Sequence, residues 1–281
     1  MDMNLLEEKF KGLPDHKKVA FKALKYLSES PDVIGLYLSG SFAKGLPDIY
    51  SDLDINILVD PTKREKIVKE HQENLIKNVG KIATLFPATH LGDPNQIIVF
   101  YEEGVPIHVD YQYRVLEDLL PTSKNKDVLV LFDPGGVLTE WKSKCLIAKP
   151  ETLPINDKMQ YFEDRFWGWC AYTDAKIERG ELWESRDALE YLRSNVLVSL
   201  AYFKLGLPNE GNRRLESKFP TDILNSLTST VPLGLDKNSY KDALLSTIEG
   251  YTTLFRDVSS LNTTNKTTLA DREYFIRSIK S

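Results

Sequence analysis

The sequence predicts an α+β protein in two parts: a mixed sheet with helices over residues 1–150, then an all-helical domain over residues 151–281. Three observations predict this organisation. Short apolar runs typical of strands are confined to the first part, at 33–39, 52–59, 97–101, 105–113 and 128–132. Helical periods lie between some of these runs. After a polar, proline-bearing stretch at 149–154, only helical periods follow.

Composition limits the class of protein. The chain has 281 residues, 42% of them apolar, and a formal charge of −5 from 36 basic and 41 acidic residues. That charge argues against a protein that holds long nucleic acid. Cys145 and Cys170 are too few for a disulfide scaffold and lack metal-ligand spacing. The N-terminus is not a signal peptide and no apolar run spans a membrane. We expect a cytoplasmic monomer or homodimer.

Helices and strands alternate along the first part. Apolar spacing predicts helices over residues 3–29, divided near Pro14 and Asp15 into a short and a longer helix. Residues 42–45 are expected to form one helical turn, closed by Gly45, and residues 61–79 a charged crossover helix. The strands at 97–101 and 105–113 are expected to pair through a turn at 102–104.

Gly40 and Ser41 stand where the first strand gives way to the helical turn. Glycine lets the backbone approach a ligand closely and serine adds a hydroxyl donor, which suits a phosphate. Lys44, in the same turn, is a candidate cation for the phosphates, with a solvated lysine as the equal alternative. Asp52 and Asp54, two residues apart on the next strand, point to one face.

A third carboxylate follows on a later strand. Residues 105–114 alternate, and the polar side carries His108, Asp110, Gln112 and Arg114. A carboxylate on a strand inside a domain is costly without partners. Asp110 beside Asp52 and Asp54 would have such partners if the three share cations. His108 lies on the same face, where a structural histidine is the simpler interpretation.

The second part reads as helices throughout. Helical periods cover about 155–178, about 189–203, a short stretch from 220, and 240–258 after the N-cap candidates Asn238 and Ser239, with a last short helix over 270–280. Four aromatic residues at helical spacing either stack on a substrate or fill the core: Trp167, Trp169, Tyr172 and Trp183.

The predicted site suits phosphoryl chemistry. Converging carboxylates offer the oxygen ligands that Mg²⁺ prefers. Two such ions about 3.5–4 Å apart can hold both the attacking and the leaving oxygen. With the β and γ phosphates at Gly40 and Ser41, attack falls at the α-phosphate and pyrophosphate leaves. We therefore expect Mg²⁺ as cofactor and ATP, or another nucleoside triphosphate, as co-substrate.

The stretch GSFAKGLPDIYSDLDINILV resembles the signature of the nucleotidyltransferase superfamily with the DNA polymerase β-like fold. That signature is Gly-Ser, a spacer of about ten residues, Asp-x-Asp, and a third carboxylate on a later strand. The resemblance covers roughly residues 30–115. The residues that match the antibiotic-modifying branch are Gly40, Ser41, Ala43, Gly45, Ser51, Asp52 and Asp54, and Asp110 fits the third carboxylate.

This resemblance implies Mg²⁺-dependent transfer of a nucleoside monophosphate, usually AMP, to an acceptor hydroxyl. It implies that Asp52, Asp54 and Asp110 are the catalytic and metal-binding residues, and that Gly40 and Ser41 bind the nucleotide. Lys44 lies outside the matching residues and is a nucleotide-binding candidate by its place in the turn alone. The order of domains is similar to lincosamide and aminoglycoside nucleotidyltransferases, with catalysis in 1–150 and substrate binding in 151–281. Candidates for the general base are Asp110, Glu163, Asp164, Asp187 and Glu190.

Three functions remain open from the sequence. The first is nucleotidylation of a small molecule, such as an aminoglycoside- or lincosamide-like antibiotic, with no membrane or nucleic-acid partner. The second is nucleotidylation of a protein or tRNA. The acidic balance argues against an RNA acceptor, and the chain length argues against a minimal antitoxin-type enzyme. The third is a non-catalytic nucleotide-binding relative, against which the three intact carboxylates argue.

Overall fold

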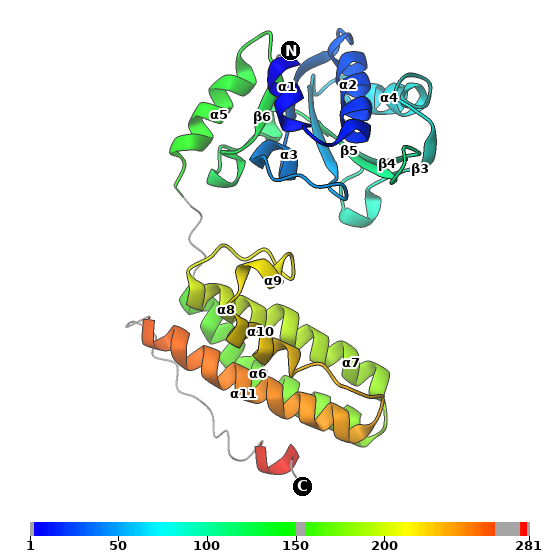
Figure 1. Ribbon diagram of the computed structural model, residues 1–281. Helices are drawn as coiled ribbons and strands as arrows, with labels where there is room; N and C mark the ends of the chain where they lie inside the picture. The colour runs from blue at the N-terminus through cyan, green and yellow to red at the C-terminus, as the bar shows by residue number, and fades with distance from the viewer. Residues whose placement is uncertain (1–2, 150–154, 262–275, 280–281) are drawn as a thin grey trace. The chain divides into compact units, whose positions relative to one another are not determined.

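The computed structural model describes residues 3–149, 155–261 and 276–279. The chain divides into two compact units, Met1–Glu151 and Thr152–Ser281 (Figure 1). The first unit holds a six-stranded mixed sheet with helices, and the described residues of the second are helical or in loops. The predicted fold class is therefore confirmed. The catalytic and substrate-binding roles expected for the two parts stay predictions.

The first unit contains every strand of the described chain. Its elements in order are α1 (Met3–Lys9), α2 (Pro14–Ser28), β1 (Val33–Leu38), α3 (Gly40–Lys44), β2 (Leu53–Val59), α4 (Arg64–Asn78), β3 (Ile82–Pro87), η1 (Thr89–Leu91), β4 (Gln96–Tyr101), β5 (Ile107–Arg114), η2 (Leu116–Asp118), η3 (Ser123–Asn125), β6 (Leu129–Phe132) and α5 (Val137–Ile147). The sequence did not predict β3 or α5. β3 is an edge strand with no buried residue, so it lacks the apolar pattern of the other strands.

The sheet has the strand order β3-β4-β5-β2-β1-β6. β2 and β5 form its one parallel pair, and every other neighbouring pair is antiparallel. In this parallel pair Asp54 lies opposite Asp110, and Leu53 lies opposite Val109. β2 and β5, the two strands predicted to have a polar face, are therefore direct neighbours in the middle of the sheet.

The two faces of the sheet are covered differently. On one face α2 and α4 pack over a large apolar core that includes Ile55, Ile57, Val109 and Tyr111 (Figure 1). On the other face α5 covers only the β1–β6 side, where Trp141 contacts Tyr37 in a smaller cluster that also includes Leu58. Partial cover leaves the polar side of β2 and β5 available for a site near the start of both strands.

The second unit is a helical bundle with its own apolar core. Its helices are α6 (Ile155–Glu178), α7 (Leu182–Tyr191), the π-helical segment η4 (Leu192–Leu197), α8 (Val198–Leu205), α9 (Leu215–Lys218), α10 (Thr221–Thr228) and α11 (Lys237–Leu261). α6, α7, α8 and α11 pack around Phe166, Leu200 and Tyr251. The rings of Phe166 and Tyr251 stack with centroids 3.6 Å apart.

Several boundaries differ from those expected. α11 begins at Lys237, and Asp236 takes the capping role expected of Asn238 and Ser239, because its Oδ1 accepts the Ser239 N–H at 3.0 Å. Of the expected helix over 270–280, only 276–279 lies within the described residues, and it is helical. Most of the expected linker lies outside them. In the described chain, no helix is both long and apolar enough to cross a bilayer.

Candidate active site

Three carboxylates converge at the start of β2 and β5. Asp52, Asp54 and Asp110 each offer one oxygen, and these three oxygens lie within 4.8 Å of one another. All three side chains are half-buried. Asp52 precedes β2 and Asp54 is its second residue, while Asp110 is brought beside Asp54 by the parallel pairing of β2 with β5.

Gly40 closes one side of this cluster. It begins α3 with a φ of +66°, in the left-handed region that favours glycine. A Cβ atom at this position would overlap the Asp54 Oδ2 atom, so the glycine backbone lies directly against the carboxylate. In the described structure the neighbour that the Gly40 backbone meets is Asp54, and its close approach to a phosphate stays a prediction.

Ser41 follows Gly40 at the same edge of the cluster. Its hydroxyl oxygen is shielded from solvent and has no hydrogen-bond partner among the residues that the structure describes. A polar atom of that kind is costly unless a ligand or water satisfies it. Lys44 ends α3 with its side chain exposed, so its role as a phosphate cation stays a prediction.

α3 is anchored to the core by its middle residue. Phe42 is buried and stacks on Phe10 of the N-terminal segment with ring centroids 4.5 Å apart. Gly45 then ends the helix in the left-handed conformation expected of it, with a φ of +72°. These contacts fix the place of Gly40 and Ser41 relative to β2.

The loop that leads into Asp52 is held by a buried histidine. The His16 Nε2–H of α2 donates to the Ser51 carbonyl oxygen at 3.0 Å. Within the loop, Ser51 Oγ accepts the Asp48 N–H at 2.9 Å and Asp48 Oδ1 accepts the Tyr50 N–H at 2.9 Å. His16 could not be singled out in the sequence, because no local pattern links it to Ser51. Burial lowers the pKa of His16, which favours its neutral form.

Side chains on β5 contact two of the carboxylates. His108 Nε2 lies 2.9 Å from Asp110 Oδ1, and this hydrogen bond raises the pKa of His108 against the opposing effect of burial. The negative charges of Asp52 and Asp54 raise it further. Gln112 Nε2 donates to Asp54 Oδ1 at 3.4 Å, and Arg114 Nη2 in turn donates to the side-chain amide oxygen Oε1 of Gln112.

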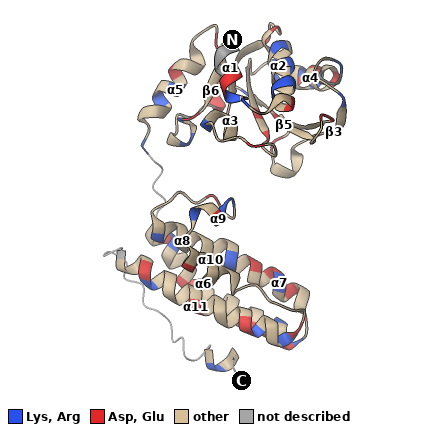
Figure 2. Ribbon diagram, in the orientation of Figure 1, with Lys and Arg blue, Asp and Glu red and all other residues tan. Residues whose placement is uncertain are grey.

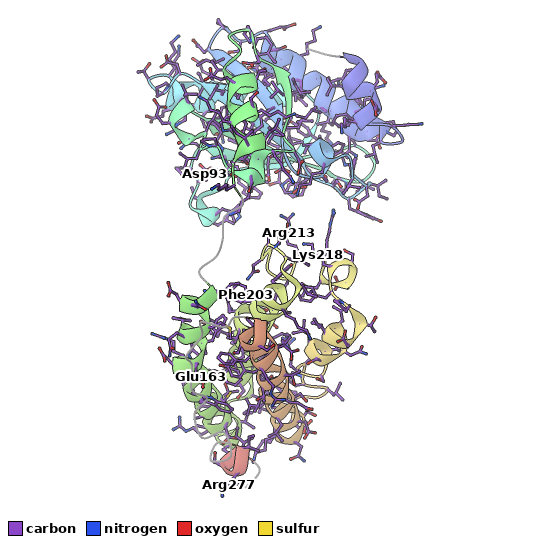
Figure 3. The ribbon with its side chains drawn as sticks, turned by 90° about the vertical axis from the view of Figure 1, so that its left-hand side faces the viewer. Asp93, Glu163, Phe203, Arg213, Lys218 and Arg277 are labelled. Atoms are coloured by element: carbon purple, nitrogen blue, oxygen red, sulfur yellow. The ribbon has the colours of Figure 1, made fainter. Side chains whose placement is uncertain are left out.

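Arg114 also reaches the loop before β4. Its Nη1 donates to Asp93 Oδ2 at 2.8 Å (Figure 3). Asp93 was not singled out in the sequence, since it comes seventeen positions before Asp110 in an irregular segment with no pattern of its own. The polar side of β5 is therefore continuous from His108 to Arg114, and its Arg114 end is held by the hydrogen bond to Asp93.

The polar side of β2 is shorter than the sequence indicated. Alternation along β2 puts Asn56 on the same side of the strand as Asp54, but Asn56 is 3% exposed. Its Nδ2 donates to Ser39 Oγ at 3.0 Å, which ties β2 to the residue that precedes α3. The open part of the face therefore ends at Asp54, and Asn56 serves to hold the end of β1 in place.

The carboxylate cluster fits a divalent cation. Oxygen ligands from carboxylates suit hard ions such as Mg²⁺, and three of them converge here on one side of the sheet. A solvent-shielded hydroxyl without a partner stands next to them at Ser41. The arrangement could hold a cation and the phosphates that accompany it.

The remaining candidates for the general base, all in the helical unit, differ in burial. Glu163 on α6 (Figure 3) is 7% exposed, and its Oε2 accepts the Tyr251 hydroxyl at 2.8 Å inside the bundle. Asp164, Asp187 and Glu190 are exposed, and Glu190 accepts the Ser194 hydroxyl at 2.5 Å. Burial makes Glu163 a structural group of the bundle.

The aromatic candidates divide in the same way. Trp167 is buried in the bundle core at 4% exposure. Trp169 is half-buried against Tyr191, with ring centroids 5.1 Å apart, while Tyr172 and Trp183 are exposed. The core interpretation therefore holds for Trp167, and a stacking role for Trp183 stays a prediction.

Comparison with known proteins gives one family match. Residues 21–107 match the sequence family described as "Nucleotidyltransferase domain". The match includes Gly40, Ser41, Asp52 and Asp54 and ends three residues before Asp110. The third carboxylate is therefore joined to the others by the sheet, through the β2–β5 pairing. A comparison with curated proteins gives no match.

Two solved structures align over most of the chain. One is an aminoglycoside 6-adenyltransferase from Bacillus subtilis, 14% identical, with a TM-score of 0.40 over 95% of this chain and 96% of that one. The other is a nucleotidyltransferase-like protein from Exiguobacterium sibiricum, 10% identical, with a TM-score of 0.35 over 94% of this chain and 87% of that one.

Proposed function

We propose that the protein, whose residues 21–107 match a nucleotidyltransferase domain, transfers a nucleoside monophosphate from a nucleoside triphosphate to a hydroxyl of a small molecule. ATP is the proposed donor and pyrophosphate the second product. Asp52, Asp54 and Asp110 are the proposed ligands of Mg²⁺. The acceptor we propose is an aminoglycoside- or lincosamide-like compound.

The convergence of three carboxylates beside Gly40 and Ser41 is the observation that supports this proposal most. Residues from two strands that are adjacent only in space bring their oxygens within 4.8 Å of one another. Like charges so close repel one another, so a purely structural role would be costly. A divalent cation bound there would neutralise phosphate charge and polarise the phosphoryl group as a Lewis acid.

The chain's own groups have separate proposed tasks. The Ser41 hydroxyl, which lacks a partner among the described residues, donates to a phosphate oxygen. The backbone at Gly40 keeps the Asp54 carboxylate in place because it lies directly against Oδ2. A carboxylate oxygen of Asp110 takes the proton of the acceptor hydroxyl as that oxygen attacks the α-phosphorus.

The acceptor class rests on charge and on the sequence resemblance. The chain is acidic, and Figure 2 shows acidic and basic residues along the helices of each unit. A polyanion such as tRNA requires basic surface, whereas a small cationic acceptor is attracted to acidic groups. These features favour a small acceptor over a nucleic acid.

The first test is an acceptor panel. The protein is incubated with Mg²⁺ and ATP labelled at the α-phosphate, and with aminoglycosides, lincosamides, a tRNA pool or a protein lysate in separate reactions. The proposal expects label to move to a member of the two antibiotic classes. Label on tRNA or protein would identify the macromolecular alternative, and ATP binding without transfer to any acceptor would favour the non-catalytic one.

The second test removes one carboxylate without changing its size. Asp54→Asn should lower the rate of transfer by about 10²–10³-fold, the range seen when one stabilising group is removed from a transition-state site. Asp60→Asn is the matched control, because Asp60 lies just beyond the other end of β2 and is half-exposed. Full activity in the Asp54 variant, with the control also active, would sink the proposed role.

A further inference from the structure

His108 stands two residues before Asp110 on β5, on the polar side of that strand. The strand alternates strictly between buried and half-buried residues from Ile107 to Arg114, so His108 and Asp110 share a face. The His108 Nε2 atom lies 2.9 Å from Asp110 Oδ1, the length of a good hydrogen bond. The neutral tautomer that carries its proton on Nε2 and the charged ring can each donate to this oxygen.

The histidine ring is itself held in a fixed plane. Phe100 on β4 is the cross-strand partner of His108. The two rings stack with centroids 4.5 Å apart and planes 15° apart. A stacked ring with a hydrogen bond at one nitrogen has little rotational freedom left, so the position of the donated proton is set by the sheet.

The location of His108 differs from that of a core histidine. His16 and His71 are buried at 4% exposure, whereas the His108 side chain is 31% exposed. It therefore adds little to packing, and its main contacts are one ring and one carboxylate.

Asp110 is the member of the cluster that most needs such a partner. Asp52 and Asp54 lie two residues apart in one stretch of backbone, just before β2 and at its second residue, and Gly40 lies against Asp54. Asp110 comes from the neighbouring strand, and its carboxylate can turn about its own side-chain bonds. A donor that fixes one of its oxygens sets the direction in which the group meets the others.

We propose that His108 is a positioning residue that orients the Asp110 carboxylate toward a divalent cation shared with Asp52 and Asp54. This inference rests on the proposed function of the cluster. Groups that hydrogen-bond to a metal ligand fix its orientation, and their loss costs about 10–100-fold in metal affinity or activity. His108 would act through Asp110 without touching the cation.

The test measures Mn²⁺ binding to the nucleotide-free protein, by the loss of the free-ion electron paramagnetic resonance signal. Two substitutions separate the ring from the donor. His108→Phe keeps an aromatic ring to stack on Phe100 and removes the N–H. His108→Gln removes the ring and keeps an amide N–H that can reach Asp110. Thermal unfolding of each variant checks that the fold is retained.

We expect His108→Phe to weaken Mn²⁺ binding about tenfold and His108→Gln to recover most of the loss. Unchanged affinity in His108→Phe would overturn the inference. Equal losses in the two variants would also overturn it, because the N–H donor of His108→Gln would then have failed to restore binding. Asp110→Asn distinguishes this failure from that of the proposed function. If Asp110→Asn binds Mn²⁺ as the wild type does, or the wild type binds none, the carboxylate site itself is wrong.

Discussion

Gly40 shows how one residue decides the geometry of the site. Its positive φ and its contact with the Asp54 carboxylate are two separate demands, and only glycine meets both. Gly45, five residues later, also has a positive φ, but a Cβ there would meet only the flexible end of Lys9, at 3.3 Å. The two glycines therefore allow backbone strain to be separated from displacement of the carboxylate.

We predict that Gly40→Ala lowers transfer activity by about 100-fold, because a displacement of order 1 Å at a reacting centre has effects of that size. Gly45→Ala should keep most of the activity. Both variants should lose about 1–2 kcal/mol of stability from the left-handed conformation. Steady-state kinetics and urea unfolding check this. Equal activity losses in the two variants would mean that strain, and not the carboxylate, is responsible.

At the residue scale the sequence identified the site in part. Gly40, Ser41, Asp52, Asp54 and Asp110 could be singled out because each stands at a marked place in a strand pattern. The supporting residues His16, Asp93 and Phe100 could not be singled out, because no local pattern records their contacts. Those contacts are made across the sheet or between an early helix and a later loop.

At the scale of elements, the parallel pairing of β2 and β5 creates the site. Alternation along each strand was visible in the sequence, but the partner of each strand was not. An antiparallel or distant arrangement of the same strands would have separated Asp54 from Asp110. β5 pairs antiparallel with β4 on one side and parallel with β2 on the other, which makes the sheet mixed.

α4 covers the apolar side of this strand pair through a buried histidine. His71 packs against Tyr113 of β5 and Tyr26 of α2, with ring centroids 5.6 Å away in each case. Its Nδ1 has no hydrogen-bond partner among the described residues. Burial lowers the pKa of His71 from 6.5 to about 4, so the folded protein holds this ring neutral where the unfolded chain would protonate it.

The consequence is a defined pH dependence of stability. Because the folded pKa lies below the unfolded one, the unfolded state binds more protons as pH falls from about 6.5 toward 4, and stability is lost in that window. Between about pH 7 and pH 5 His71 should account for a loss of roughly 2 kcal/mol.

Urea unfolding at the two pH values checks this, with His71→Leu and the exposed His90→Leu compared. The His71 variant should lose less stability on acidification than the wild type does, and the His90 variant should follow the wild type. A His71 variant that loses as much as the wild type would contradict the assignment.

At the scale of the whole molecule, the chain builds two cores. The apolar clusters of the first unit contain no residue beyond Cys145, and that of the second contains none before Met159. The change from strand to helical periods made this division visible in the sequence. The sequence motif, in contrast, lies wholly in the first unit, which is why the reaction could be predicted in more detail than the acceptor.

Separate cores predict separate responses to a core substitution. Phe166→Leu, which removes the ring that stacks on Tyr251, should destabilise the helical unit by roughly 1 kcal/mol. Amide hydrogen exchange should become faster in α6 and α11 and stay at the wild-type rate in β2 and β5. Equal acceleration in both units would show that they unfold together.

The central claim is that the carboxylate cluster directs attack to the α-phosphorus of a nucleoside triphosphate. The most direct measurement compares ATP labelled at the α-phosphate with ATP labelled at the γ-phosphate, in parallel reactions with Mg²⁺ and an acceptor from the panel. The proposed function predicts α-label on the acceptor and γ-label in released pyrophosphate, with both appearing about 10²–10³-fold more slowly in Asp54→Asn. Label from the γ-phosphate on the acceptor, or transfer at the wild-type rate in Asp54→Asn, would contradict it.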